Sequence, residues 1–366
     1  MPERGRNAMR AGAILNIPNQ IGILELDRPT AGPDDVIVKP HRVGLCMTNV
    51  KMARHGYYAI DQRGLPFMEG HEVSGEVVEV GAQVKELAPG DRVAVYIYVP
   101  CHNCYYCQRG HPTMCDNFIL GGIYPGGWAE YVVISRHQQF ARRLHRIAAA
   151  VSYDDAALLE PLSCVVHSLE RSTVGAGDRV VVLGAGFMGL LHTTVLGLYP
   201  LALSISVDLS AFRLGRAAAC GAHETVLNSD PEAVVERVQE LTGGRGADVV
   251  FEVTGNVQAY ELAPRLLAKG GTALFFGGVP SSEPVRVDPR ALHYNMYRLV
   301  GCQSAEDHHV STAMALINSG RVKPSAFITQ RFPMERLSDA ILFPQQPDNR
   351  EQMIKVMLHG FDCELP

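Results

Sequence analysis

The pattern of hydrophobic and polar positions changes near residue 150. Before that point, short apolar runs broken by Gly and Pro predict a β-rich region. The clearest of these runs are Val36–Lys39, Val73–Val80, Arg92–Val99 and Ala129–Ile134. After it, the pattern predicts a helix over Tyr153–Leu169, followed by strands that alternate with helical stretches.

Six short apolar runs make up the second region, and segments long enough for crossovers separate them. These predicted strands are Arg179–Leu183, Ser204–Asp208, Glu224–Leu227, Asp248–Glu252, Thr272–Phe276 and Leu299–Cys302. Helices are predicted between them, for example over Phe212–Cys220 and Pro231–Leu241. The alternation is typical of a doubly wound parallel sheet. After about residue 304 the chain becomes helical, and it then makes a strand-like return at Gln330–Pro333.

The composition narrows the class of protein. A chain of 366 residues favours two domains, and 47% hydrophobic with 19% charged residues is ordinary for a soluble globular protein. The net charge of −5 and the lack of a Lys/Arg run argue against a nucleic-acid partner. No apolar stretch reaches the ~18 residues needed to cross a bilayer. Residues Met1–Ala8 are a predicted loose extension without the apolar core of a signal peptide, so we expect a cytoplasmic protein with no membrane partner.

Four cysteines with the spacing C-x2-C-x2-C-x7-C stand in one short segment. They are Cys101, Cys104, Cys107 and Cys115. Four thiolates this close can complete a tetrahedral zinc shell with no open position, which indicates a structural site. Disulfides are the alternative, but the chain has nine cysteines, an odd number at low density, and no secretory leader. We therefore predict a structural zinc ion here.

A glycine-rich loop indicates a dinucleotide site. The apolar run Val180–Leu183 leads directly into a G-x-G-x-x-G segment, and an apolar helix follows. Gly184 permits the tight turn, and Gly186 lets the pyrophosphate approach the backbone. Gly189 permits the close packing of the helix on the strand. Further residues assigned to the cofactor are Phe187, Met188, Thr254, Gly277, Gly278 and Val279.

Asp208 ends the next predicted strand and bears on the choice of cofactor. An acidic side chain at this place can accept the ribose hydroxyls of NAD and would repel the 2′-phosphate of NADP. We therefore predict NAD. Arg213 is the opposing signal, because it can lie near a 2′-phosphate; its alternative role is stacking on adenine.

A second set of residues can hold a catalytic metal. The candidates are Cys46, His71, Glu72 and Glu160. Cys, His and Glu are the mixed ligands of open zinc sites, which leave one position for water or substrate. Taken singly, a cysteine is usually a core residue and a histidine is usually structural. The order of these residues relative to the four cysteines and the glycine-rich loop favours a second zinc ion, which makes two per chain.

With these motifs in order, the sequence resembles the zinc-dependent medium-chain dehydrogenase/reductase family, and within it the sorbitol (polyol) dehydrogenase branch. The resemblance covers residues 9 to 366. Besides the four cysteines, it rests on Gly44-Leu45-Cys46 with Thr48, Gly70-His71-Glu72, Glu160-Pro161-Leu162-Ser163 with His167, Gly184–Gly189, Val207-Asp208-Leu209-Ser210 with Arg213, Val322-Lys323-Pro324 and Arg331-Phe332-Pro333.

The resemblance implies an α/β plus β fold with two domains. A GroES-like β-rich catalytic domain, residues 1–163 and 304–366, would carry both zinc ions. A Rossmann domain with a doubly wound parallel sheet, residues 164–303, would bind NAD. Catalysis would take place in the cleft between the two.

The resemblance also implies roles for single residues. The catalytic zinc would be held by Cys46, His71 and a glutamate. That glutamate is either Glu72, with Glu160 holding a water on the metal, or Glu160 directly. Thr48 would hydrogen-bond the substrate alcohol. The zinc would act as a Lewis acid on this alcohol, whose hydride passes to the nicotinamide.

Three positions depart from the family pattern. Asn49 replaces the usual Asp, which removes a carboxylate that would orient His71. Lys51 replaces the usual proton-relay His; a lysine can relay protons only where burial favours its neutral form, and otherwise it is a surface charge. Where the polyol branch has an Arg-Tyr pair, this chain has the neutral residues Ser304 and Ala305, followed by Glu306 and Asp307. These acids would either favour a cationic substrate or cap the following helix.

Together these features predict NAD-dependent oxidation of a secondary alcohol on a polyol, cyclitol, aminocyclitol or amino-sugar-like compound. A threonine-dehydrogenase-like amino alcohol oxidase is the alternative enzyme, and a non-catalytic member of the fold is the alternative from another class. The expected partners are a small-molecule alcohol and further copies of the chain. A homodimer or homotetramer is expected because the predicted strand Leu299–Cys302 lies at a sheet edge.

Overall fold

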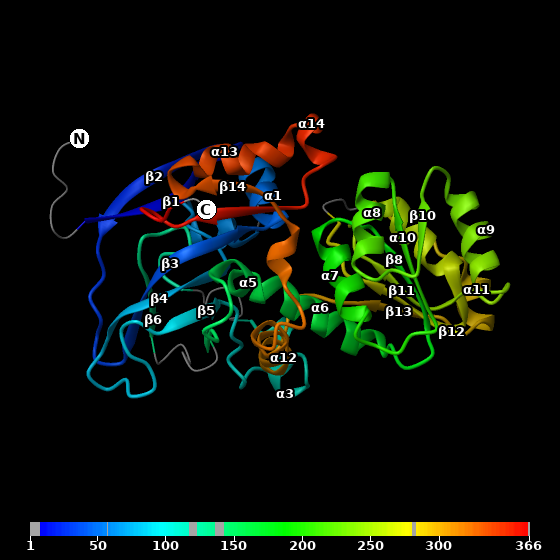
Figure 1. The fold of residues 1–366 in the computed structure, drawn as a ribbon, viewed down its shortest axis with the longest axis horizontal. Coiled ribbons are helices and arrows are strands. Elements are labelled where there is room, and N and C mark those ends of the chain that lie inside the picture. The colour runs from blue at the N-terminus through cyan, green and yellow to red at the C-terminus, as the bar shows by residue number, and fades with distance from the viewer. Residues whose placement is uncertain (1–7, 57, 117–122, 136–142, 280–282, 365–366) are drawn as a thin grey trace. The chain divides into compact units, whose positions relative to one another are not determined.

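The computed structural model describes residues 8–56, 58–116, 123–135, 143–279 and 283–364 (Figure 1). The chain divides into two compact units, Met1–Ser163 with Glu306–Pro366, and Cys164–Ala305. The sequence-based boundaries at residues 163 and 303 lie at or beside these divisions. The first unit is built on a mostly antiparallel sheet and the second on a parallel one, so the predicted fold class is confirmed. Within the described ranges, no helix has the length and apolar character that crossing a membrane would require.

The first unit contains a seven-stranded sheet in the order β14-β15-β3-β4-β5-β7, and β6 pairs with β3. The bounds are β3 Asp35–Leu45, β4 Glu72–Val80, β5 Arg92–Tyr96, β6 Val132–Ser135, β7 Leu144–Arg146, β14 Ile328–Pro333 and β15 Lys355–His359. The predicted runs of the first region fall on β3 to β6, whereas the pattern missed β7 and β15. Figure 1 shows the red C-terminal strand beside the blue strands of this unit, as the β15–β3 pairing requires.

A separate antiparallel hairpin precedes this sheet. Its strands are β1, Ala8–Asn16, and β2, Gln20–Asp27. Ala11 and Ile14 of β1 are fully buried and belong to the apolar core of the unit. Because Ala8 lies in β1, the predicted loose extension is wrong at that residue. Residues 1–7 lie outside the described part of the chain.

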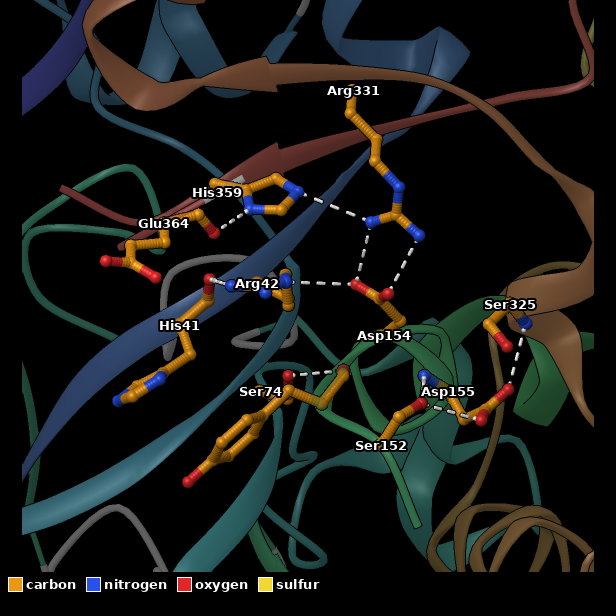
Figure 2. Close-up of polar contacts among 11 residues, drawn as sticks. His41, Arg42, Ser74, Ser152, Asp154, Asp155, Ser325, Arg331, His359 and Glu364 are labelled. Carbon is orange, nitrogen blue, oxygen red and sulfur yellow. Dashed lines mark hydrogen bonds and ion pairs between the residues drawn. The ribbon is translucent and has the colours of Figure 1, made fainter. Parts of the chain in front are cut away.

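A network of charged side chains ties the C-terminal strands to the N-terminal ones (Figure 2). Asp154 stands in helix α5, Tyr153–Ala157, and its carboxylate accepts from Nε of Arg42 on β3 at 3.0 Å. Arg331 on β14 donates to both oxygens of the same carboxylate, at 3.1 and 2.8 Å. A two-pronged arginine–carboxylate pair is geometrically specific as well as strong. One aspartate therefore fixes α5, β3 and β14 relative to one another.

The second unit is a six-stranded parallel sheet in the order β10-β9-β8-β11-β12-β13. Its strands are β8 Arg179–Leu183, β9 Leu203–Asp208, β10 Glu224–Leu227, β11 Ala247–Glu252, β12 Leu267–Phe275 and β13 Arg298–Gly301. Helices α7 Phe187–Leu196, α8 Ala211–Ala219 and α9 Pro231–Leu241 pack against these strands (Figure 1). The strand order is that of the Rossmann fold, so the predicted doubly wound sheet is confirmed.

One predicted helix is broken in two. The pattern predicts a continuous helix over Tyr153–Leu169, but the structure has α5, Tyr153–Ala157, and α6, Leu159–Ser172. The physical reason is Pro161, which has no N–H to donate to the carbonyl of Ala157 and would clash with it in an unbroken helix. A new helix therefore begins just before the proline.

The second unit also buries a histidine beneath its glycine-rich loop. Nδ1 of His192 lies 2.8 Å from the carbonyl oxygen of Met188, and Nε2 lies 2.7 Å from Oγ of Ser168. Because a carbonyl only accepts, Nδ1 carries the proton and Nε2 accepts, as in a neutral ring. Phe251 and Phe276 cover the ring, with centroids at 5.2 and 5.0 Å. Burial lowers the pKa of His192 to about 4.

This histidine should make the stability of the protein depend on pH. In the unfolded chain it titrates near its ordinary pKa of about 6.5, so only the unfolded state binds its proton between about pH 6.5 and about pH 4. The contribution of His192 to the free energy of unfolding is therefore fully present above that window, and the free energy of unfolding falls by roughly 2 kcal/mol by about pH 5. We expect urea unfolding followed by circular dichroism to show this loss in wild type. His192→Gln should reduce this loss of stability at low pH, whereas His293→Gln, the control at an exposed site, should not. The same pH dependence in wild type and both variants would contradict the assignment of the loss to His192.

Candidate active site and metal centres

The structure brings Cys46, His71 and Glu72 together, with one ligand atom of each within 4.8 Å of the others. Cys46 directly follows β3 and caps helix α1, Met47–His55, while Glu72 begins β4 and His71 directly precedes it. The two strands are antiparallel neighbours, and their register places Gly44 opposite Glu72. Sulfur, imidazole and carboxylate are together the donor set of an open zinc site. The three residues therefore fit the metal that the sequence predicts.

Glu72 is held by a buried ion pair. Nζ of Lys355 on β15 lies 2.7 Å from Oε1 and 2.6 Å from Oε2, and it also donates to the carbonyl oxygen of Leu45 at 3.1 Å. Both side chains are almost fully buried, so each charge needs the other. Gly44 allows this arrangement, because a Cβ there would overlap the carboxylate of Glu72.

A carboxylate orients the ring of His71. Nδ1 of His71 lies 2.9 Å from Oε1 of Glu69, which leaves Nε2 as the nitrogen that can bind a metal. The expectation that Asn49 removes the orienting carboxylate is therefore wrong, because Glu69 supplies it. Burial disfavours a charged ring, but the negative charges of Glu69 and Cys46 outweigh it and raise the pKa of His71 well above its usual range. The site therefore attracts positive charge.

Glu160 lies outside the close set of three ligand atoms. It stands in the first turn of α6 and is buried. Burial raises the pKa of Tyr98 well above its usual range, and the carboxylates of Glu69 and Glu160 raise it further. The ring of Tyr98 lies 5.8 Å from that of His71, centroid to centroid. Glu160 therefore faces the same buried region as the candidate metal ligands.

The two other predicted catalytic residues lie on α1. The backbone N–H of Thr48 donates to Sγ of Cys46 at 3.4 Å, which places Thr48 beside the metal ligands. Lys51 is exposed on the same helix. The relay role of Lys51 required burial, and the structure does not provide it, so the alternative of a surface charge is favoured.

The four predicted cysteine ligands form the four-cysteine lobe, residues 101–115. Their sulfurs all lie within 4.8 Å of one another, and Sγ of Cys104 is 3.5 Å from Sγ of Cys107. All nine cysteines lie in the described part of the chain and none forms a disulfide, so the disulfide alternative is wrong. The backbone N–H of Cys107 lowers the pKa of Cys104 to about 6, whereas burial and neighbouring thiols raise the pKa of Cys107 to about 12. Zinc would displace the remaining protons on binding.

The glycine-rich loop joins β8 to α7. Gly184 has a φ of +104°, and a Cβ on Gly189 would overlap the carbonyl oxygen of Gly184, so both positions need glycine. Gly186 is the N-cap residue of α7 and provides no side-chain cap. This leaves the positive end of α7 suited to a pyrophosphate. Phe187 and Met188 form the first turn of that helix.

The two residues that bear on the choice of cofactor both lie beside this loop. Asp208 ends β9, and its carboxylate accepts from the backbone N–H of Ala185 at 2.6 Å and of Ser210 at 2.9 Å. Nη1 of Arg213 would lie 4.0 Å from a Cβ placed on Gly186. Both an acidic and a basic side chain are therefore available to a bound nucleotide.

The remaining predicted cofactor residues follow β11 and β12. A buried carboxylate, Glu252, accepts from the backbone N–H of Thr254 at 2.7 Å, and its own carbonyl accepts from Gly277 at 3.0 Å. A Cβ on Gly255 would overlap the carbonyl of Gly278. The loops that carry Thr254, Gly277, Gly278 and Val279 thus lie against each other at the carboxyl ends of neighbouring strands, where this fold binds ligands.

Glu306 and Asp307 begin a helix, α12, Asp307–Asn318. Glu306 is the N-cap residue, and its backbone N–H donates to Nδ1 of His309 at 3.1 Å. Asp307 lies 3.4 Å from Nε2 of His102 in the four-cysteine lobe. The helix-capping alternative is therefore the one that the geometry favours over recognition of a cationic substrate.

Sequence reasoning missed four residues around these sites, Glu69, Tyr98, Lys355 and Glu252. Neither Glu69 nor Lys355 could have been found from the sequence, since no local pattern relates them to His71 and Glu72.

Comparison with known proteins identifies the family. Residues 32–144 match the family model "Alcohol dehydrogenase GroES-like domain", and residues 202–319 match "Zinc-binding dehydrogenase". The chain is similar to the sorbitol dehydrogenase of Gallus gallus, with 29% identity over 351 residues, 93% of this chain and 95% of that protein. It is 30% identical to the L-threonine 3-dehydrogenase of Pyrococcus furiosus over 328 residues, 87% and 91% of the two chains.

A solved structure agrees with these relatives. A Sinorhizobium meliloti 1021 protein bound to NADP superposes with a TM-score of 0.86 at 28% identity, over 97% of this chain and 100% of that one. The fold, the glycine-rich loop and the two donor clusters define a zinc-type dehydrogenase of the alcohol dehydrogenase kind. The chain belongs to the zinc-dependent medium-chain dehydrogenase/reductase family.

The four-cysteine lobe provides a test of the structural metal. We expect Cys104→Ser to lower the zinc content by about one ion per chain and to lower the melting temperature, because a structural zinc contributes directly to folding. Cys220→Ser, at a lone cysteine in the second unit, should change neither. Elemental analysis and thermal unfolding measure both quantities. Unchanged zinc in Cys104→Ser would show that the lobe is not a metal site.

Proposed function

We propose that this chain is a zinc-dependent NAD oxidoreductase that oxidises a secondary alcohol of a polyol or cyclitol to the ketone. The observation that carries the proposal is the set of a half-buried Cys46 with buried His71 and Glu72, in a chain that also has a dinucleotide loop. An aminocyclitol or amino sugar is the less favoured form of the substrate, because Glu306 and Asp307 begin a helix.

The residues of the site have distinct proposed tasks. Cys46, His71 and Glu72 would hold the zinc, which would supply a Lewis acid that lowers the pKa of the substrate hydroxyl. Thr48, beside Cys46, would hydrogen-bond that hydroxyl. Glu160 would hold a water in the same buried region. Lys355 would keep the charge of Glu72 compensated.

The proposed cofactor is NAD. Asp208 supports it, because a carboxylate at the end of β9 disfavours a 2′-phosphate. NADP is the competing choice, since Arg213 also lies beside the loop and the similar Sinorhizobium meliloti protein is bound to NADP. Steady-state rates with each cofactor separate the two.

An amino alcohol such as threonine is the second candidate substrate. The similarity to an L-threonine 3-dehydrogenase, at 30% identity, favours it. Such a substrate carries an ammonium and a carboxylate that a polyol lacks, so the two classes require different contacts. A substrate panel that includes both classes therefore decides between them.

The decisive experiment is a substrate and cofactor panel on zinc-loaded protein. We expect reduction of NAD with sorbitol, arabinitol or a cyclitol, and slower reduction with threonine and with NADP. Cys46→Ser should lower kcat/KM by about 10³-fold or more with the fold intact, because several kcal/mol of transition-state stabilisation are lost. Asp208→Ala should reduce the preference for NAD over NADP, because it removes the charge that would repel a 2′-phosphate. No turnover of any alcohol by fully zinc-loaded protein would favour a non-catalytic member of the fold.

We further propose a homo-oligomer. β13 is an edge strand of the six-stranded sheet, and an open edge can pair with a second copy of itself. Static light scattering at micromolar concentration should give the mass of a dimer or tetramer. A mass of one chain would contradict this proposal without affecting the catalytic one.

A further inference from the structure

Two buried polar side chains connect the backbone of Cys46 with the ring of His71. Asn49, fully buried, accepts at Oδ1 from the backbone N–H of Cys46 at 3.2 Å. Its Nδ2 donates to Oε2 of Glu69 at 2.6 Å. Since an N–H only donates and a carboxylate only accepts, these partners fix the orientation of the amide. Glu69 in turn contacts Nδ1 of His71.

Three donors converge on the carboxylate of Glu69. They are Nδ2 of Asn49, the backbone N–H of Gly70 and Nδ1 of His71, which lies 2.9 and 3.0 Å from the two oxygens. A carboxylate has two acceptor oxygens for them. A glutamine would offer one oxygen and two N–H donors, so it would oppose a donor with a donor. The arrangement therefore requires a carboxylate rather than a polar side chain of the same shape.

The backbone of Glu69 is also fixed from outside the site. Its carbonyl accepts from the N–H of Trp128 at 3.0 Å, and Gly127 donates to the carbonyl of Gly70 at 2.9 Å. Trp128 is almost fully buried, and Gly126 must lack a Cβ because one would overlap the backbone of Glu69. The carboxylate thus sits on a rigid support, as a group that positions another side chain should.

We propose that Glu69 is the positioning residue of the metal site, and that Asn49 acts through it to hold Cys46 and His71 in one fixed geometry. The inference rests on the metal site of the proposed function and deepens it. The carboxylate of Glu69 orients the ring of His71 directly. The amide of Asn49 connects that carboxylate with the backbone of Cys46. Both side chains are required for this arrangement, since neither Asn49 nor Glu69 alone contacts both Cys46 and His71.

Metal affinity tests this proposal independently of turnover. Zinc is titrated against a chelator in wild type, Glu69→Gln and Glu130→Gln, and the absorption spectrum of cobalt-substituted protein is recorded for each. Glu130 is the matched control, a buried carboxylate of the same unit whose partner is Arg10. We expect Glu69→Gln to weaken the less tightly bound zinc by about 10–100-fold and to shift the cobalt spectrum. Glu130→Gln should leave both unchanged.

A second variant covers the case in which Glu69→Gln does not fold. Asn49→Ala keeps the carboxylate but removes the link to Cys46, and it should weaken the same zinc by several-fold. In the double variant the two effects should not add, because Asn49 acts through Glu69. An unchanged zinc affinity in Asn49→Ala or in Glu69→Gln would overturn the inference alone, and so would additive effects in a folded double variant. A wild-type protein that binds zinc only in the four-cysteine lobe would overturn it together with the proposed function.

Discussion

The antiparallel pairing of β3 with β4 is the constraint on which the metal site depends. The register sets Gly44 opposite Glu72, so the residue after one strand and the residues at the start of the other meet at one place. A slip by one residue would turn every side chain of β4 to the opposite face of the sheet. The buried valines of both strands prevent such a slip, because they fix which face is apolar. Packing of the core thus determines the chemistry at the end of the strands.

Much of this architecture is predictable from local sequence patterns. The parallel sheet follows from short apolar runs with helices between them, and the loop of Gly184 follows from its place between a strand and a helix. The four-cysteine lobe is equally predictable, because its four cysteines lie within one segment of the sequence. Where the prediction failed in the fold, a single local cause explains it, as with Pro161 and the break between α5 and α6.

The surroundings of the metal ligands were harder to predict, because they depend on contacts between distant segments. Considered alone, Asn49 indicates that the site lacks the carboxylate that the family has at this position. Only the fold shows that Glu69, on another segment, supplies the charge. Lys355 is further removed still, and its pairing with Glu72 depends on β15 lying next to β3. Local patterns therefore identify the donors, while the groups that hold the donors come from tertiary structure.

The ion pair of Glu72 with Lys355 has a consequence for the order in which the protein is made. The ribosome synthesises Glu72 long before Lys355, so the first strands emerge with a carboxylate that has no counter-charge inside the nascent sheet. Burying that carboxylate alone is unfavourable, and β3 and β4 gain their full stability only when β15 arrives. The surroundings of the candidate metal ligand Glu72 are thus completed only after the second unit of the chain has emerged.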